Sequence, residues 1–255
     1  MSRTARLIMF GCAGAATAVA VILAVLVMPS FGGSHHQYRD NAVVSGVHHR
    51  TSNIVASVNF DQRGLDTLGE ETILLASVMG VSVLLRPAED ETEKQSLSSG
   101  RVLDAVRLGG YVLLPVTAII GFDVVAHGHV TPGGGFQGGV VLGTGLHLLY
   151  VAGTYEALEK VRPVTAFEWG EALGSAAFAC FGIAGVLAAG AFLVNIIPLG
   201  HFGDLFSSGT VPVLNSAVGI EVASGTMVLL SKFLEQAIRI TGERNSAKHN
   251  GTASS

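Results

Sequence analysis

The sequence predicts an all-α, polytopic membrane protein with about six transmembrane helices and both termini in the cytoplasm. Of its 255 residues, 49% are hydrophobic and only 13% are charged, which is about half the charged fraction of a typical soluble domain. The apolar residues also fall into runs of about 18 to 24 positions, long enough to cross a hydrocarbon core about 30 Å thick. We therefore expect a multi-pass protein of the cell's inner (plasma) membrane, in contact with membrane lipids.

Polar or helix-breaking segments separate six apolar runs. The runs cover about residues 7–28, 68–85, 106–126, 136–151, 172–194 and 211–230. The fourth run is short, and glycines recur through the last four, which is typical of membrane helices that pack closely on other helices. The first run follows Arg3 and Arg6, so a cleaved signal peptide remains an alternative to a membrane span there.

The distribution of Lys and Arg predicts the orientation, because cytoplasmic loops retain these residues. With the N-terminus inside, twelve of the fifteen Lys and Arg residues lie on the inner side, and only Arg39, Arg50 and Arg63 lie outside. The loops at 127–135 and 195–210 contain neither Lys nor Arg. We therefore place these two loops on the outer face.

Composition and spacing exclude several classes of function. The net charge is -4 and no cluster of Lys and Arg is dense, so nucleic acid is not an expected partner. Cys12 and Cys180 lie inside apolar runs, where a thiol behaves as a small hydrophobe. The paired histidines at 35–36 and 48–49 do not by their spacing define a metal site. No nucleophile, base and orienting group converge recognisably, so we expect neither an independent enzyme nor a cofactor.

Residues 127–139 join the third and fourth runs and read His-Gly-His-Val-Thr-Pro-Gly-Gly-Gly-Phe-Gln-Gly-Gly; we call this segment the glycine-rich turn. Pro132 removes a backbone donor, and the three glycines after it permit conformations that a Cβ would forbid. The helix must therefore break here. A glycine-rich turn before a helix can bind phosphate, but this one lacks the Lys and the Ser or Thr arrangement of a P-loop, which favours a tightly packed or re-entrant turn.

The glycine-rich turn closely resembles the signature turn of the B subunit of Mrp (also called Mnh) sodium/proton antiporters. The resemblance extends over about residues 107–242, and the four apolar runs there agree with that family's four-helix domain. The turn residues that it singles out are Thr131, Pro132, Gly133, Gly134, Gly135, Phe136, Gly138 and Gly139.

A second resemblance covers residues 59–72, which are similar to a motif in the C-terminal tail of the family's large A-type subunit. In the related membrane-bound hydrogenases this tail is a separate small protein. The chain thus resembles a fusion of a two-helix segment (1–90), an acidic linker (91–105), a four-helix domain (106–242) and a disordered tail (243–255). Where the family's tail motif usually has an apolar residue after its glutamate, this chain has Glu71 after Glu70. The family's role is therefore carried over to Glu70 alone.

Glu221 lies near the middle of the sixth run, where an ionised side chain costs about 2.5 to 3.5 kcal/mol unless it is paired or faces water. The family often has an acidic residue at the matching place, which implies a part in handling protons. The alternative is a protonated Glu that bonds to a neighbouring helix.

Glu70 lies at the outer entrance of the second run, and the resemblance implies that it takes part in ion transport. Asp66 and Thr67 precede it, so helix capping is the alternative. Asp61, Arg63 and Asp66 are expected to form a charge network around it at the membrane interface.

Two further ionisable residues complete the predicted ion path. His147 lies inside the fourth run and is expected to relay protons or to pair with Glu221 across helices, although the resembled family does not usually show a histidine there. Asp123 precedes the glycine-rich turn, and a solvated or hydrogen-bonded state near the outer interface is its alternative.

Taken with the resemblance, these residues imply an accessory membrane subunit of a multi-subunit antiporter that exchanges Na+ for H+, in a hetero-oligomer with other Mrp/Mnh-type subunits. Glu70 and Glu221 would close part of the ion path. One alternative is the same module in a membrane-bound hydrogenase or a related respiratory complex. A second is a scaffold subunit that does not touch ions.

Overall fold

The computed structural model describes residues 3–28, 33, 36–86, 103–152 and 164–252, and these fold into helices and their connections. The chain divides into two compact units, residues 1–40 and 41–255. The first unit contains α1 (Arg3–Val27), whose apolar stretch has none of its residues buried. An apolar helix that is exposed all round suits a lipid environment.

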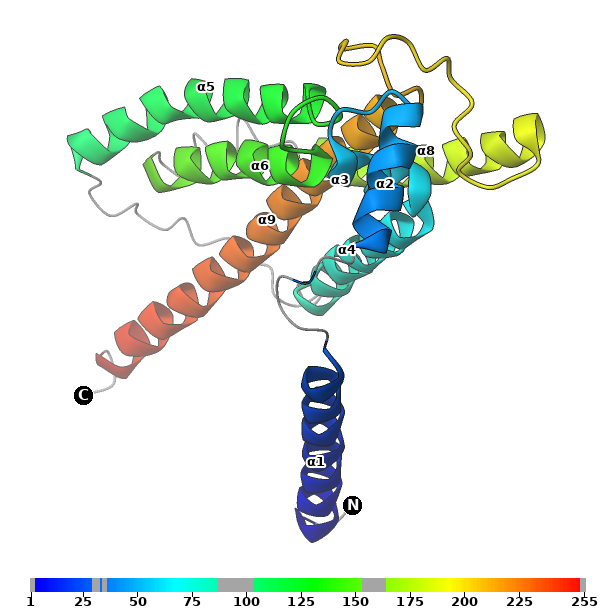
Figure 1. Ribbon diagram of the computed structural model, residues 1–255. Coiled ribbons are helices and arrows are strands. Elements are labelled where there is room, and N and C mark those ends of the chain that lie inside the picture. Colours follow the sequence, from blue (N-terminus) through cyan, green and yellow to red (C-terminus); the bar gives the residue numbers. More distant parts are fainter. Residues whose placement is uncertain (1–2, 29–32, 34–35, 87–102, 153–163, 253–255) are drawn as a thin grey trace. The chain divides into compact units, whose positions relative to one another are not determined.

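Five long helices and a short helical segment build the second unit (Figure 1). The long helices are α4 (Gly64–Leu84), α5 (Asp104–Ala126), α6 (Gly135–Ala152), α8 (Val164–Ala189) and α9 (Val211–Thr252). α9 contacts the other four. Its most apolar stretch is 61% buried, against 11–22% for those of α4, α5 and α8, so α9 is the central helix and the others surround it.

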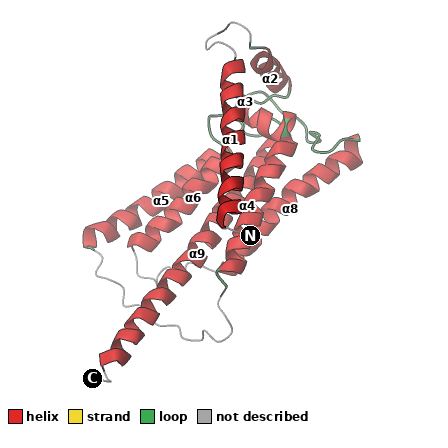
Figure 2. Ribbon diagram, turned by 90° about the horizontal axis from the view of Figure 1, so that it is seen from below, coloured by secondary structure: helices red, strands yellow, loops and turns green. Residues whose placement is uncertain are grey.

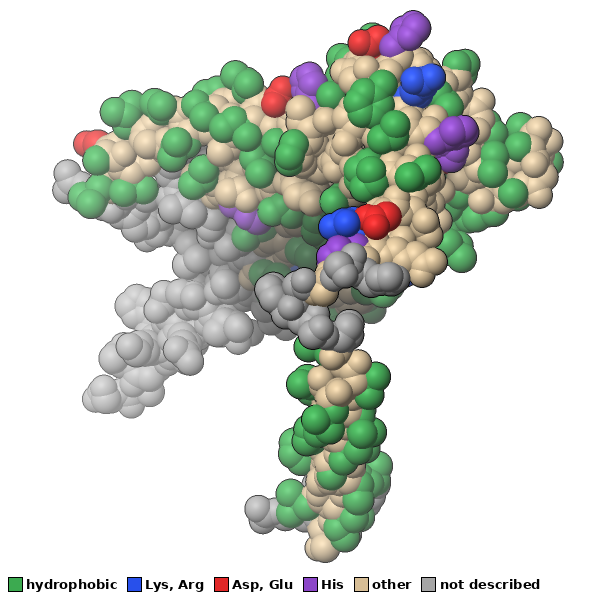
Figure 3. Space-filling view, in the orientation of Figure 1, with side chains coloured by type: hydrophobic (Ala, Val, Ile, Leu, Met, Phe, Trp, Pro, Cys, Tyr) green, Lys and Arg blue, Asp and Glu red, His purple; other side chains and the backbone are tan. Residues whose placement is uncertain are grey.

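Small residues allow the helices to approach closely. α5 and α6 lie side by side, joined by the glycine-rich turn (Figures 1 and 2). A Cβ at Gly139 of α6 would lie 2.8 Å from the carbonyl oxygen of Gly219 on α9, and one at Gly174 of α8 would lie 2.7 Å from the Cβ of Glu221. On the face drawn in Figure 3, hydrophobic side chains cover much of α5 and α6 and charged side chains are few, as expected for a surface that meets lipid.

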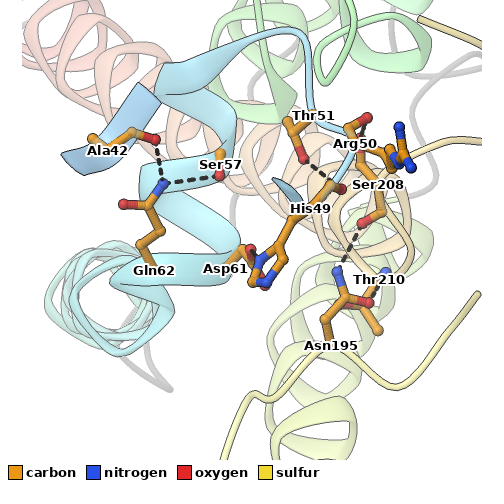
Figure 4. Close-up of polar contacts among 10 residues, drawn as sticks. All are labelled: Ala42, His49, Arg50, Thr51, Ser57, Asp61, Gln62, Asn195, Ser208 and Thr210. Atoms are coloured by element: carbon orange, nitrogen blue, oxygen red, sulfur yellow. Dashed lines mark hydrogen bonds and ion pairs between the residues drawn. The ribbon is translucent and has the colours of Figure 1, made fainter. Parts of the chain in front are cut away.

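Short helices occupy the segment that the sequence predicts as a polar outer loop. These are α2 (Gln37–His48), α3 (Ile54–Ser57) and the π-helical turn η1 (Val58–Gln62). Asn53 caps α3, because its side-chain Oδ1 accepts hydrogen bonds from the N–H groups of Val55 and Ala56. Gln62 donates from Nε2 to the carbonyl oxygen of Ala42 and to Ser57 Oγ (Figure 4). The segment is therefore ordered by local polar contacts.

The predicted all-α membrane fold is confirmed, with corrections to some boundaries. Within the described residues, five helices, α1, α4, α5, α8 and α9, are long and apolar enough to span a membrane, and the remaining predicted span is the 18-residue α6. α8 starts earlier than expected, at Val164. It also ends earlier, at Ala189, because Gly190 adopts φ +77° after its last turn. α9 continues to Thr252, so most of the segment expected to be disordered is helical. The orientation of the termini stays a prediction.

The predicted domain boundaries stay predictions. α1 belongs to the first unit, and α4 packs against α8 and α9 in the second. Most of the predicted acidic linker lies outside the described residues, which resume at 103.

Candidate functional site

The glycine-rich turn is held by an asparagine from the segment before α4. Asn53 donates from Nδ2 to the carbonyl oxygens of Gly128 (2.7 Å) and Thr131 (3.0 Å). Its backbone N–H donates to the carbonyl oxygen of His129 at 3.0 Å. Because the Oδ1 of the same side chain caps α3, Asn53 fixes the start of α3 and the turn relative to each other.

A second asparagine, Asn215 of α9, holds the turn from the opposite side and is fully buried. Its Oδ1 accepts from the N–H of Gly135 at 2.5 Å, and its Nδ2 donates to the carbonyl oxygen of Val125 at 2.6 Å. A Cβ at Gly135 would collide with the backbone oxygen of Asn215. Glycine at this position therefore lets the start of α6 touch the backbone of α9.

His129 connects the turn to the loop between α8 and α9. It is fully buried, and its Nε2 donates to the carbonyl oxygen of Leu205 at 3.0 Å, while Nδ1 has no hydrogen-bond partner among the described residues. Burial lowers the pKa of His129, against a smaller opposing effect of the bond to Leu205. The ring is therefore neutral near neutral pH.

Acid is expected to destabilise this region through His129. Its folded-state pKa is below the unfolded value of about 6.5, so the unfolded state binds more protons and stability falls as the pH drops below about 6.5. We expect the temperature at which half of the detergent-solubilised complex stays monodisperse after heating to fall on acidification. His129→Gln should show less of this pH dependence, whereas His201→Gln, at an exposed position, should keep it. An unchanged dependence in His129→Gln would contradict this assignment.

The loop between α8 and α9 is tied to the turn that follows α2 (Figure 4). Asn195 donates from Nδ2 to the carbonyl oxygen of Ser208 and accepts at Oδ1 from the N–H of Thr210, both at 2.9 Å. Ser208 Oγ donates to the carbonyl oxygen of Arg50 at 3.0 Å. Hydrogen bonds thus connect the glycine-rich turn, the loop between α8 and α9 and the segment around Arg50 with one another.

Three buried carboxyl groups from three helices converge at the central helix. Glu71 of α4, Glu171 of α8 and Glu221 of α9 are 1%, 4% and 0% exposed, and Glu71 and Glu171 both interact electrostatically with Glu221. Ser175 of α8 donates from Oγ to Glu221 Oε1 at 2.5 Å. A Cβ at Gly225 would lie 3.3 Å from Glu171 Oε1, so a glycine makes room for that carboxyl group against α9.

Glu71, not Glu70, faces the interior. The buried positions of α4 include Thr67, Glu71 and Val78, which lie on one face of a helix at this spacing, while Glu70 is exposed. Glu70 and Glu71 both line a cavity of about 210 Å³ together with Gln137 and the glycines of the turn. The cavity therefore joins the two predicted features, the turn and the acidic end of α4.

The other predicted residues lie apart from this cluster. His147 is half-buried on α6 beside the backbone of Thr226, with its Nε2 unpartnered among the described residues, and it does not pair with Glu221. Asp123 is exposed and pairs with His127 at 2.9 Å, and its place in the ion path stays a prediction.

Two ion pairs form among the residues of the expected charge network at the start of α4. Asp61 pairs with His49 (Figure 4), and Arg63 pairs with Asp66.

Sequence reasoning missed Glu171, Asn53 and Asn215 and left Glu71 open. Glu171 lies outside the predicted fifth run, because the acidic pair Glu168 and Glu171 interrupts its hydropathy. The signal that could have found Glu171 is its spacing from Gly174 and Ser175, which share its helix face. For the two asparagines, whose partners lie 75 to 90 residues away, the sequence carries no local signal.

Comparisons with known proteins agree with this architecture. Residues 105–228 match a family model described as a domain related to the MnhB subunit of Na+/H+ antiporter. An uncharacterized protein of Methanocaldococcus jannaschii is 30% identical over 206 residues, which are 70% of this chain and 75% of that protein. A Rhizobium meliloti protein named as the probable A/B subunit of a K(+)/H(+) antiporter is 27% identical over 139 residues, 46% of this chain and 14% of that one.

Two solved structures have similar folds. A chain of the membrane-bound sulfane sulfur reductase, described as an archaeal respiratory membrane complex, matches with a TM-score of 0.70 and 28% identity over 90% of this chain and 98% of that one. A chain of the Mrp complex from Dietzia sp. matches with a TM-score of 0.66 and 24% identity over 91% of this chain and 26% of that one, a likeness of fold. This protein belongs to the family of membrane proteins related to the MnhB subunit of Na+/H+ antiporters.

Proposed function

We propose that this protein is an accessory membrane subunit of a multi-subunit antiporter that exchanges a monovalent cation, Na+, for protons. The observation that carries the proposal is the convergence of Glu71, Glu171 and Glu221 on the central helix, beneath a turn typical of the family. Intramembrane carboxyl groups are costly, and three of them on facing helices favour an ion path over a passive scaffold. Its partners are the other subunits of such a complex.

Carboxyl groups suit both ions of the exchange. An ionised carboxylate supplies the oxygen ligands that hard cations prefer, and a protonated one carries the proton. Glu70 lines the cavity beside the glycine-rich turn and Glu221 lies buried behind it, so an ion that enters the cavity would meet Glu70 and Glu71 before Glu221. This order of contact supports an ion path through Glu70 and Glu221, the two carboxyl groups for which the sequence predicts that role.

Replacing Glu221 with Gln is expected to lower the initial rate of exchange about tenfold or more, because the amide keeps the shape but can neither bind a proton nor balance a cation. The measurement is the sodium-dependent ΔpH in everted vesicles from an antiporter-deficient strain that expresses the whole gene cluster, at matched complex abundance. Asp104→Asn, at the exposed start of α5, is the control and should exchange like the wild type. Full exchange by Glu221→Gln in an intact complex would favour the scaffold interpretation.

The same module in a respiratory complex is the second candidate, and one observation favours it. The chain matches 98% of one chain of the membrane-bound sulfane sulfur reductase. The distinguishing measurement is the driving force: an antiporter exchanges ions in vesicles energised by an imposed proton gradient, whereas a respiratory complex needs an electron donor and acceptor.

A further inference from the structure

The side chains of Glu71 and Glu221 face each other across the contact between α4 and α9. The carboxyl group of Glu71 interacts with that of Glu221, and both residues are at most 1% exposed. Both oxygens of Glu71 and Oε2 of Glu221 have no hydrogen-bond donor among the described residues, while Oε1 of Glu221 accepts from Ser175 Oγ. Three buried acceptor oxygens in one place thus lack a donor.

No cation compensates these groups within the part of the chain that the structure describes. The ion pairs there leave out Glu71, Glu171 and Glu221, and Lys232 of α9 lies 3.8 Å from Glu168 instead. The other charged groups that interact with Glu71 and Glu171 are Glu70 of α4 and Glu168 of α8, and His147 of α6 lies beside the backbone of Thr226. These surroundings therefore add negative charge and supply no positive partner.

One proton resolves this arrangement. Two neighbouring carboxyl groups in an apolar interior cannot both be ionised, because each disfavours the charge of the other and burial disfavours both. A hydrogen atom between them provides the missing donor for their free oxygens. The bond from Ser175 favours the ionised form of Glu221, so the proton is carried by Glu71 and donated toward Glu221 Oε2.

The cavity beside the glycine-rich turn reaches this pair at Glu71. Asn59, Thr67, Glu70 and Gln137 contribute polar groups to its lining, and Glu71 is part of the wall. Glu221 lies behind Glu71, on the side of α8. A proton or a small cation that enters the cavity therefore reaches Glu71 before Glu221.

We propose that Glu71 and Glu221 act as one site that holds a single shared proton and exchanges it for one monovalent cation through this cavity. The inference rests on the proposed antiporter function and extends it to Glu71, which the resemblance left without a role. The charge balances: the pair carries a charge of -1 with the proton bound and -1 with one cation in its place, because the proton leaves to water in the cavity as the cation enters.

Carbodiimide labelling of the purified whole complex tests the pair without an ion gradient. Dicyclohexylcarbodiimide adds to a protonated carboxyl group and rearranges to a stable N-acylurea, which peptide mass spectrometry assigns to Glu71 or Glu221. The quantity compared is the pH at which labelling falls to half. For the pair in the wild type we expect this midpoint to lie about one pH unit or more above that of Glu221 in Glu71→Gln. We also expect Na+ to slow the labelling of the wild-type pair. Glu221→Gln should shift the labelling of Glu71 in the same direction.

Glu168→Gln is the matched control, since it removes a nearby carboxylate that is half-exposed and lies outside the pair; its labelling midpoint should equal that of the wild type. Equal midpoints in the wild type and both pair variants would overturn the shared proton, and labelling that Na+ does not slow would overturn the exchange for a cation. The outcomes separate the two proposals. If the midpoint differs between the wild type and the pair variants but the complex transports no ions, the antiporter function alone is contradicted. If transport requires Glu221 but the midpoint is the same in all of them, the shared proton of the pair alone is contradicted.

Discussion

Replacing Asn215 with Leu is expected to lower the free energy of unfolding by about 2 to 6 kcal/mol, because it leaves buried hydrogen-bonding groups of the glycine-rich turn and of α5 without their partner, at about 1 to 3 kcal/mol each. The N–H of Gly135 and the carbonyl oxygen of Val125 both bond to this one side chain. The measurement is the temperature at which half of the detergent-solubilised complex remains monodisperse after heating.

Ser216→Ala supplies the control for this prediction, since Ser216 is the next residue on α9 and its Oγ bonds within the same helix, to the carbonyl oxygen of Pro212 at 2.8 Å. Its stability should stay within about 0.5 kcal/mol of the wild type. A wild-type melting temperature in Asn215→Leu would mean that the turn is held by other contacts.

Gly135→Val should separate α6 from α9 and reduce the amount of assembled complex severely. A Cβ at this position collides with the backbone oxygen of Asn215 and would lie 2.9 Å from the nitrogen of Gly219. Overpacking costs about 1 to 3 kcal/mol where side chains can move aside, and here the neighbours are backbone atoms, so the cost lies at or above the top of that range. The yield of assembled complex on a native gel, relative to total protein, measures this effect.

Gly109→Ala, in α5, serves as the comparison. A Cβ at Gly109 has no atom within 4 Å, and exchanging Gly for Ala inside a helix stabilises it by about 0.5 to 1 kcal/mol. Equal yields of Gly135→Val and Gly109→Ala would show that the contact between α6 and α9 tolerates a wider spacing.

Hydropathy predicted the helices well because membrane insertion depends on a local property, the length of an apolar run. The break at the glycine-rich turn was equally local. Predictions were less accurate where polar residues continue a helix beyond the apolar run. Thus α8 begins before its acidic residues, at Val164, and α9 continues through a charged segment to Thr252, where residues such as Lys, Glu and Ala favour helix.

The choice between Glu70 and Glu71 illustrates why the site was predictable only in part. Both residues lie at the same depth of the same helix, about 100° apart around its axis. Which one is buried depends on the side from which α9 approaches, and that is a long-range property. The resemblance assigned the role to Glu70, while the packing of Thr67 and Val78 turns Glu71 inward. Both roles remain predictions for experiment.

The central position of α9 has a consequence for biogenesis. Among the described helices it leaves the ribosome last, yet it provides contacts for α4, α5, α6 and α8. Glu71 and Glu171 must therefore enter the membrane before Glu221 and Ser175 have been brought together. During that interval the earlier helices depend on the insertion machinery or on neighbouring subunits for polar contacts, and a chain interrupted before Val211 would leave these carboxyl groups without their contacts to α9.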